Sequence, residues 1–193
     1  MAAEMGLSYT YNVGHLLPKT MQRYYFAGPT KTLFQFVDGL HGWHKGVELF
    51  VFDARVQIND QNGRKKQRPI SMIMIVSPAL RLPHFSIIPI HDFVLAYPVF
   101  GYEKISFRQK DIQFANLYVV QGQEENQVKT AVNQSVRAQM KQLINRSCEG
   151  KGDQLIFYYE DHCILPERLP EFIDQAYALY DLFAFPQKDP KDF

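Results

Sequence analysis

The sequence predicts an α+β fold, in which a curved antiparallel β-sheet or partial barrel carries a long helix, a further strand and a C-terminal helix. The chain reads as strands and loops up to about residue 120, and as helix, strand and helix after about residue 123. Runs of strands followed by helical elements are typical of α+β architecture. We expect residues 1–185 to form a single domain and residues 186–193 to form a flexible C-terminal tail.

The composition supports a folded domain and limits the classes of molecule that it is expected to bind. The chain has 193 residues, of which 46% are hydrophobic, and a chain of this length buries roughly 70% of its unfolded surface. Its 21 basic residues balance 20 acidic residues, whereas nucleic-acid binders usually carry a basic excess, so no nucleic-acid partner is expected. The two cysteines form no CxxC motif, and no signal-peptide or membrane-helix pattern is visible. A cytoplasmic location is therefore expected.

The clearest local signal is a β-hairpin made by VELFVFDARVQI (47–58) and PISMIMIVS (69–77). Between them, Asn62-Gly63 is the strongest two-residue turn signal, because both positions tolerate a positive φ. A turn centred there predicts Phe52 opposite Ile73. At the root of the hairpin, residues at both odd-numbered and even-numbered positions are apolar. Because alternate residues of a strand face opposite sides, we expect burial on both faces of the sheet.

Periodicity predicts the remaining elements. The alternation of DIQFANLYVVQ predicts a strand, whereas the spacing of Val128, Val132, Val136, Met140, Leu143 and Ile144 predicts a long helix ended by Gly150 and Gly152. The expected strands are 21–26, 32–37, 84–88, 111–121 and 154–160, and the expected helices are 124–148 and about 167–184.

The segment HGWH contains the first candidate site, formed by His41, Trp43 and His44. Two imidazoles that converge can ligate a metal, although a stable site needs three or four ligands. His84 and His91 could complete the site from distant segments, and Asp38 lies close by in the sequence. Glycines before, within and after the segment favour instead a corner between two strands, with Trp43 capping the end of the sheet. The interpretations are thus a corner, a ligand contact, or the centre of a metal-dependent hydrolase.

The predicted hairpin tip contains the second candidate site, because four basic residues gather there. A cluster of this kind can hold a phosphate group or an anionic lipid surface. It can equally be a charged tip that protects the hairpin from aggregation. The residues are Arg64, Lys65, Lys66 and Arg68.

The sequence assigns no catalytic residue, cofactor or resident metal. The nucleophile elbow GxSxG, the phosphate loop GxxxxGK[ST] and the dinucleotide fingerprint GxGxxG are missing. His162 precedes Cys163, but neighbours in an extended chain point to opposite faces, which argues against a working pair. Glu48 and Asp53 fall on opposite faces of their strand, so they form no acid–base pair.

The segments DARVQ, RPISMIMIVSPALRLPHFSIIP, FANLYVVQG and LPEFIDQAYAL carry a resemblance at the level of pattern. Over about residues 31–184 the chain resembles a family of uncharacterised bacterial proteins, in which paired strands precede an LPHF-like segment, a long helix, a strand and a short helix. Many members of that family look membrane-tethered through N-terminal segments, whereas no such tether is expected for this chain. The resemblance supports the strand order and implies no activity or site residue.

These observations favour a non-enzymatic binding or regulatory domain that contacts a protein partner, because a complete core occurs without a convergent catalytic set. Peripheral membrane contact is compatible with the same sequence. The alternatives are a metal-dependent hydrolase that uses HGWH, and an anionic-lipid or phosphate binder that uses the basic hairpin tip.

Overall fold

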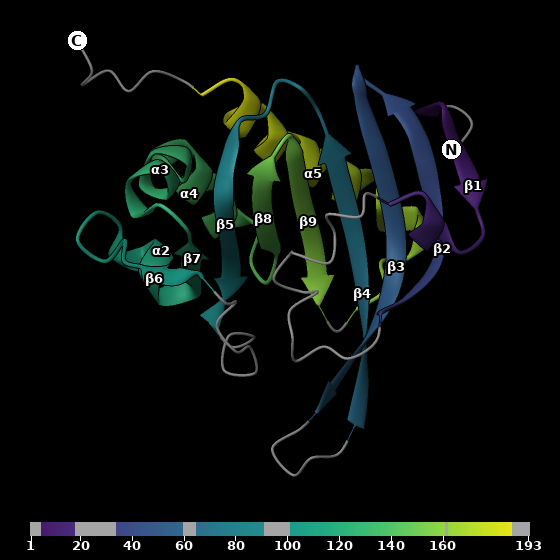
Figure 1. The fold of residues 1–193 in the computed structure, drawn as a ribbon, viewed down its shortest axis with the longest axis horizontal. Coiled ribbons are helices and arrows are strands. Elements are labelled where there is room, and N and C mark those ends of the chain that lie inside the picture. Colours follow the sequence, from purple (N-terminus) through teal and green to yellow (C-terminus); the bar gives the residue numbers. More distant parts are fainter. Residues whose placement is uncertain (1–4, 18–33, 60–64, 91–100, 161, 187–193) are drawn as a thin grey trace.

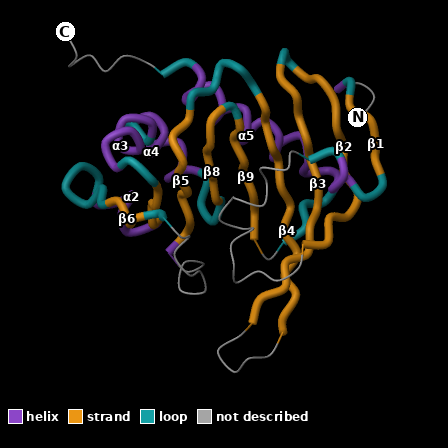
Figure 2. Tube along the Cα trace, in the orientation of Figure 1, coloured by secondary structure: helices purple, strands orange, loops and turns teal. Residues whose placement is uncertain are grey.

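The computed structural model describes residues 5–17, 34–59, 65–90, 101–160 and 162–186. Within these ranges the fold is α+β, as the sequence predicts: strands form one open antiparallel sheet, and the helices α2 to α5 pack on one of its faces (Figures 1 and 2). Nine strands are described, in the order β1-β2-β3-β4-β9-β8-β5-β7-β6. The sheet therefore has two edges, β1 and β6.

The strands are β1 (Leu7–Thr10), β2 (Phe34–His44), β3 (Val47–Asn59), β4 (Lys65–Val76), β5 (Leu82–Pro89), β6 (Glu103–Ile105), β7 (Tyr118–Gly122), β8 (Ser147–Gly152) and β9 (Gln154–Glu160). The helices are α2 (Ile112–Leu117), α3 (Glu125–Ala131), α4 (Gln134–Gln142) and α5 (Leu169–Ala184), with 3-10 turns η2 at Val13–His15 and η5 at Pro166–Arg168. No described helix is both long enough and apolar enough to cross a membrane.

The predicted hairpin exists as β3 and β4, but its predicted register is wrong by one residue. Phe52 lies opposite Met72, and Ile73 lies opposite Val51. The two strands are joined by residues 60–64, outside the described residues, so the predicted turn at Asn62-Gly63 is not placed. The hydrophobic pattern could not choose the register, because both faces of the hairpin root are buried and a one-residue slip exchanges one apolar face for the other.

Two predicted elements change type in the structure. The first half of the expected strand 111–121 is helix α2, because the Asp111 side chain caps it by accepting a hydrogen bond from the Phe114 N–H at 3.0 Å. The expected helix 124–148 divides into α3 and α4 at Asn133, whose side chain caps the second helix in the same way. That helix ends before Gly150, and residues 147–152 form strand β8 instead. Ile144, expected in the buried stripe, is 60% exposed.

The other expected elements have mixed outcomes. Strand 154–160 matches β9, strand 84–88 lies within β5, and the C-terminal helix matches α5 to within two residues at its start. The expected strand 32–37 is the beginning of β2 as far as it is described. The expected strand 21–26 and the tail from residue 187 lie outside the described residues.

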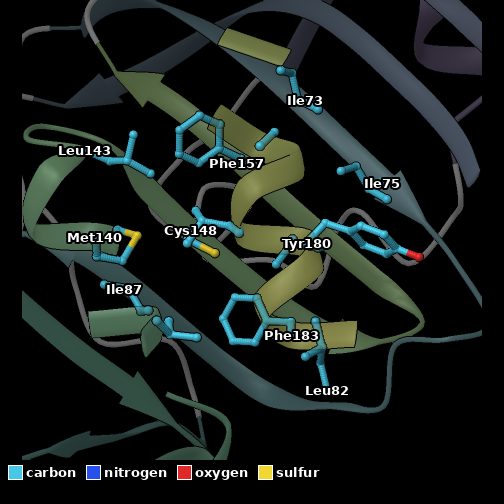
Figure 3. Close-up of a cluster of buried hydrophobic side chains, with 14 of the residues drawn as sticks. Ile73, Ile75, Leu82, Ile87, Met140, Leu143, Cys148, Phe157, Tyr180 and Phe183 are labelled. Atoms are coloured by element: carbon cyan, nitrogen blue, oxygen red, sulfur yellow. The ribbon is translucent and has the colours of Figure 1, made fainter. Parts of the chain in front are cut away.

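The sheet separates two hydrophobic clusters. The larger lies between the sheet and the helices and contains Ile73, Ile75 and Phe157 (Figure 3). The smaller lies on the opposite face and contains Phe50 and Met72. Helix α5 is fixed to the larger cluster by ring contacts, such as Phe157 with Phe172 at 5.1 Å between centroids. Burial on both faces explains why the central strands are apolar at nearly every position.

Candidate functional site

HGWH is the end of a strand and not the predicted corner between strands. Residues 41–44 are the last four residues of β2. The chain turns at the next two residues, Lys45 and Gly46, which have positive φ values of 50° and 81°. Such a two-residue turn matches the twist of the antiparallel strands β2 and β3. Trp43 is 69% exposed.

The two histidines of HGWH do not converge. His41 stacks on Phe50 at 4.3 Å and its Nε2 lies 3.0 Å from a Glu48 carboxylate oxygen. The His44 ring lies on the opposite face, where it contacts Tyr177 edge to face and its Nδ1 lies 3.0 Å from the Met5 carbonyl oxygen. Residues three apart in a strand face opposite sides.

A metal centre at HGWH therefore lacks its first requirement, two converging imidazoles. Across the described ranges there is no group of three or more His, Cys, Asp or Glu side chains that could hold a metal ion. His91, which the sequence offered as a further ligand, lies outside those ranges.

The basic hairpin tip is described only in part. Arg64 lies outside the described residues, and Lys65 and Lys66 begin β4 opposite Asn59 and Ile58. Arg68 is half-buried further along the strand. Figure 1 shows the two strands of this hairpin extending beyond the body of the sheet. The proposed contact with phosphate or anionic lipid remains a prediction.

A hollow on the helix-bearing face of the sheet is the strongest candidate site. This sheet groove has a volume of about 360 Å³ and crosses from β1 over β2 and β3 to β4. The segment before α5 and its first turn form the remaining wall. The lining residues are Tyr9, Asp38, Gly39, Leu40, Val51, Phe52, Asp53, Ser71, Ile164, Pro166, Leu169 and Phe172.

A β-bulge places two carboxylates in the sheet groove. Phe36 pairs with Ala54 and Gly39 pairs with Phe52, so the two residues between Phe36 and Gly39 face the single residue Asp53. Asp38 is one of those two. A bulge re-aims side chains and is common beside functional sites. Here it brings Asp38 and Asp53 to the same hollow.

Gly39 fits the close approach of the strands at the bulge. A Cβ atom built there would lie 2.7 Å from the Val51 carbonyl oxygen and 2.9 Å from the Phe52 Cβ. Real Cβ atoms essentially never approach other atoms so closely. The glycine therefore permits the local geometry that brings the two carboxylates into the groove.

Asp53 is held by neutral hydrogen-bond donors. The Ser71 hydroxyl donates to Asp53 Oδ1, and the Ile164 N–H donates to the Ser71 oxygen at 2.8 Å. Burial raises the pKa of Asp53 above its usual value, while the hydrogen bonds from Ser71 and Cys163 oppose the shift. The structure thus holds a carboxyl group among apolar side chains, and no cationic side chain of the described residues pairs with it.

Asp38 presents an acceptor atom without a hydrogen bond. Its Oδ1 is buried and has no partner among the described residues. Hydrogen bonding to Asp38 raises the pKa of the Tyr9 hydroxyl, which places the two groups together at one rim of the groove. A buried acceptor left without a donor is costly, and native proteins usually satisfy such atoms.

The cysteine and histidine that are neighbours in the sequence lie beside the segment that walls the groove and do not form a reactive pair. Burial raises the pKa of the Cys163 thiol, and the Asp53 charge raises it further, so the reactive thiolate is disfavoured. The preceding histidine is stacked on Tyr159 at 4.3 Å. Glu48 contacts His41 on the far face of β3, which confirms that Glu48 and Asp53 lie on opposite faces.

Sequence reasoning missed the sheet groove. The sequence placed Asp53 only on one face of its strand, and it placed Asp38 only close to HGWH. One signal was available, because Asp53 interrupts an otherwise apolar run between Phe52 and Ala54. A buried carboxyl group in such a run indicates either a paired charge or a site.

Comparison with known proteins gives a likeness in structure. No protein-family model matches the chain, and no curated protein sequence matches it. The crystal structure of the mycobacterial trehalose monomycolate transport factor A, TtfA, aligns with a TM-score of 0.65 over 97% of this chain and 93% of that chain. The chain has the fold of TtfA.

The aligned sequences of the two proteins are 11% identical, so the likeness concerns the fold alone. It covers nearly the full length of both chains. The sequence predicted a resemblance to a family of bacterial proteins. Of that prediction, the comparisons support a structural likeness to one mycobacterial protein.

Proposed function

We propose that the chain is a non-enzymatic binding domain and that the sheet groove holds an amphiphilic ligand. The observation that carries the proposal is a hollow of about 360 Å³ lined mainly by apolar side chains. Small-molecule sites are typically hollows of about 300 to 1,000 Å³ with apolar walls and a few polar groups. The groove has this character, with Leu40 and Val51 in its floor and Asp38 and Asp53 among its polar groups.

The likeness to TtfA supports a binding role in transport. That protein is named as a factor in the transport of trehalose monomycolate. A transport factor must hold or pass on its cargo without changing it, which agrees with the protonated thiol and neutral donors beside the groove. Function does not follow from fold alone, so the groove itself has to be tested.

Filling the groove tests the proposal directly. Nile red, a neutral apolar dye, should bind the wild-type protein and increase its fluorescence. Leu40→Trp should abolish this binding, because the indole occupies the hollow. The matched control is Ile144→Trp, which makes the same kind of change at a residue that is 60% exposed and should leave dye binding unchanged.

Both variants must first show the wild-type circular dichroism spectrum. Equal dye binding by folded Leu40→Trp and wild-type protein would place the dye elsewhere and remove the support for the groove. Loss of binding in both variants would show a general effect of the added tryptophan.

A protein partner at the β1 edge is the second candidate function. β1 is the last described strand on its side of the sheet, and Tyr9 and Tyr11 are 64% and 80% exposed there. Edge strands accept extended segments of other chains, and exposed tyrosines are enriched in protein interfaces.

A photo-crosslinking amino acid at Tyr11 tests the protein-partner candidate in living cells. It should give a discrete crosslinked species that the same amino acid at Ile112 does not give, although Ile112 is also exposed, at 55%. Crosslinks of equal yield and pattern from both positions would contradict a β1 interface.

The basic hairpin tip supports a peripheral membrane contact as a further part of the proposal. It predicts salt-sensitive binding to liposomes that contain anionic lipid, because screening weakens charge attraction. Changing Arg64, Lys65, Lys66 and Arg68 to Ser should remove the binding. Binding that survives both the substitutions and added salt would contradict a role for these charges.

A further inference from the structure

We infer that the sheet groove selects ligands whose head group donates hydrogen bonds, either hydroxyl groups or an ammonium group, and rejects anionic head groups. This inference rests on the proposed function and deepens it by stating the chemistry of the ligand head.

The first observation is the charge of the lining. Among the described residues, the lining contains two carboxylic acids, Asp38 and Asp53, and no Lys, Arg or His. An anionic head would meet like charge in a partly desolvated hollow, which is unfavourable. A cation or a neutral donor would meet acceptors.

The second observation is the unpartnered Asp38 Oδ1, which is buried beside the groove. The donors of the neighbouring acid are already fixed, because Ser71 and Cys163 both bond to Asp53. Asp38 therefore has the acceptor capacity that a ligand hydroxyl or ammonium group would satisfy. A hydrogen bond to a charged acceptor is among the stronger polar contacts.

The third observation is the bulge that sets Asp38 and Asp53 in the same hollow. The two acids therefore present acceptor atoms to the same part of the groove. A donor-bearing head placed between these acids and the apolar wall would meet both sets of acceptors. The walls at Leu169 and Phe172 would take the attached apolar chain.

Head-group selectivity can be measured with decyl compounds that share one chain. Decyl glucoside supplies hydroxyl groups, decylamine supplies an ammonium group, and decanoate supplies a carboxylate. Each is titrated below its micelle concentration by isothermal calorimetry. We expect decyl glucoside, decylamine or both to bind at least about tenfold more tightly than decanoate, because one hydrogen bond to a charged group contributes that much.

The titrations with decyl glucoside and decylamine distinguish a hydroxylated head group from a cationic one. Binding of decylamine that weakens with added salt identifies a cationic head, because screening acts on charge. Binding of decyl glucoside that salt does not change identifies a hydroxylated head. Equal affinity for all three compounds would overturn the inference while leaving the apolar groove intact. Binding of none of them would overturn the proposed function itself.

Asp38→Ala locates the selectivity. The variant should lose the preference over decanoate, so that the affinity ratio falls from about tenfold toward equality. Asp174→Ala is the matched control, since its side chain is 73% exposed on α5, and it should keep the preference. A preference that persists in folded Asp38→Ala would contradict the assignment.

Discussion

The two halves of the helix-bearing sheet face differ in how completely they are covered. Under helices α3 to α5, Phe85, Ile87 and Phe157 on β5 and β9 are at most 1% exposed. Near β1, β2 and β3 the helical cover stops at the first turn of α5, and the sheet groove opens there. The same alternation of apolar residues therefore builds a closed core in one half and a ligand-sized hollow in the other.

The acidic residues of the two halves differ in the same way. Beside the helices, Asp111 contacts Lys141 at 2.9 Å and Arg137 at 3.5 Å. In the groove, Asp53 is bonded by a hydroxyl and a thiol. The described carboxylate of the closed half is matched by cations from its own chain, whereas Asp53 in the groove is bonded by neutral donors.

Truncating a ring in the closed half should have the largest effect. Phe157 is 1% exposed and packs on Phe172 of α5. Phe157→Ala should lower the free energy of unfolding by about 3 to 5 kcal/mol, the usual cost of removing a buried ring. Urea unfolding followed by circular dichroism measures it. A cost below about 1 kcal/mol would mean that this half is not the rigid core described here.

Removing the paired acid should have the next largest effect. Asp111→Ala removes the cap of α2 and leaves Arg137 and Lys141 without this carboxylate, so we expect a loss of about 1 to 3 kcal/mol. Asp111→Asn keeps the capping oxygen and should lose less. Equal stability of the two variants in urea would show that the capping hydrogen bond contributes nothing, and wild-type stability of Asp111→Asn would show that the ion pairs contribute nothing.

A matched pair of valines compares the halves directly. Val120→Ala in the closed half should cost about 2 kcal/mol, from lost transfer energy and a new cavity. Val51→Ala should cost about 1 kcal/mol or less, because its side chain already borders a hollow. The two residues are 2% and 7% exposed. Equal costs in urea unfolding would remove the physical difference between the halves.

The pH dependence of Asp53 and Asp111 should have opposite signs. Burial raises the pKa of Asp53 above its ordinary 3.8, so its contribution to stability is complete below that value and is lost as the pH rises through the folded-state pKa. The pKa of Asp111 is lowered: burial opposes the shift, but hydrogen bonds from Lys141 and the Phe114 N–H outweigh it. Its contribution is present at neutral pH and lost as the pH falls.

Asn variants separate these two effects. Relative to wild type, Asp53→Asn should have an equal or higher Tm at neutral pH and no such gain at about pH 3. Asp111→Asn should have a lower Tm at neutral pH and approach wild type in acid. Thermal unfolding across this range measures both. A fall in the neutral-pH Tm of Asp53→Asn would show that the ionised groove acid stabilises the empty protein.

The regular elements with strong local patterns could be predicted from the sequence. The helix at α5 shows a continuous apolar stripe that includes Phe172 and Phe183, and both are buried as expected. The strand at β9 is short, apolar and bounded by polar residues. In these segments local periodicity and tertiary environment agree, so the prediction of the element is also correct in its bounds.

Some elements could not be predicted, because a side-chain cap or a pairing with a distant strand overrides the local periodicity. Asn133 and Asp111 each start a helix with a side-chain hydrogen bond, which divides one predicted element and changes the type of another. Residues 147–152 follow helix α4 in sequence, yet they form a strand because β5 and β9 offer backbone partners on both sides. Those partners are distant in sequence and invisible to a local pattern.

The sequence by itself determined that this protein is α+β, that its hairpin root is buried on both faces, and that a C-terminal helix packs through one stripe. Tertiary structure alone decided the hairpin register, the opposite faces of His41 and His44, and the meeting of Asp38 with Asp53. The reason is that periodicity reports which side of an element is apolar, whereas a site requires particular side chains to meet. That meeting depends on a bulge and on where the cover of α5 ends, and both are set by contacts between distant parts of the chain.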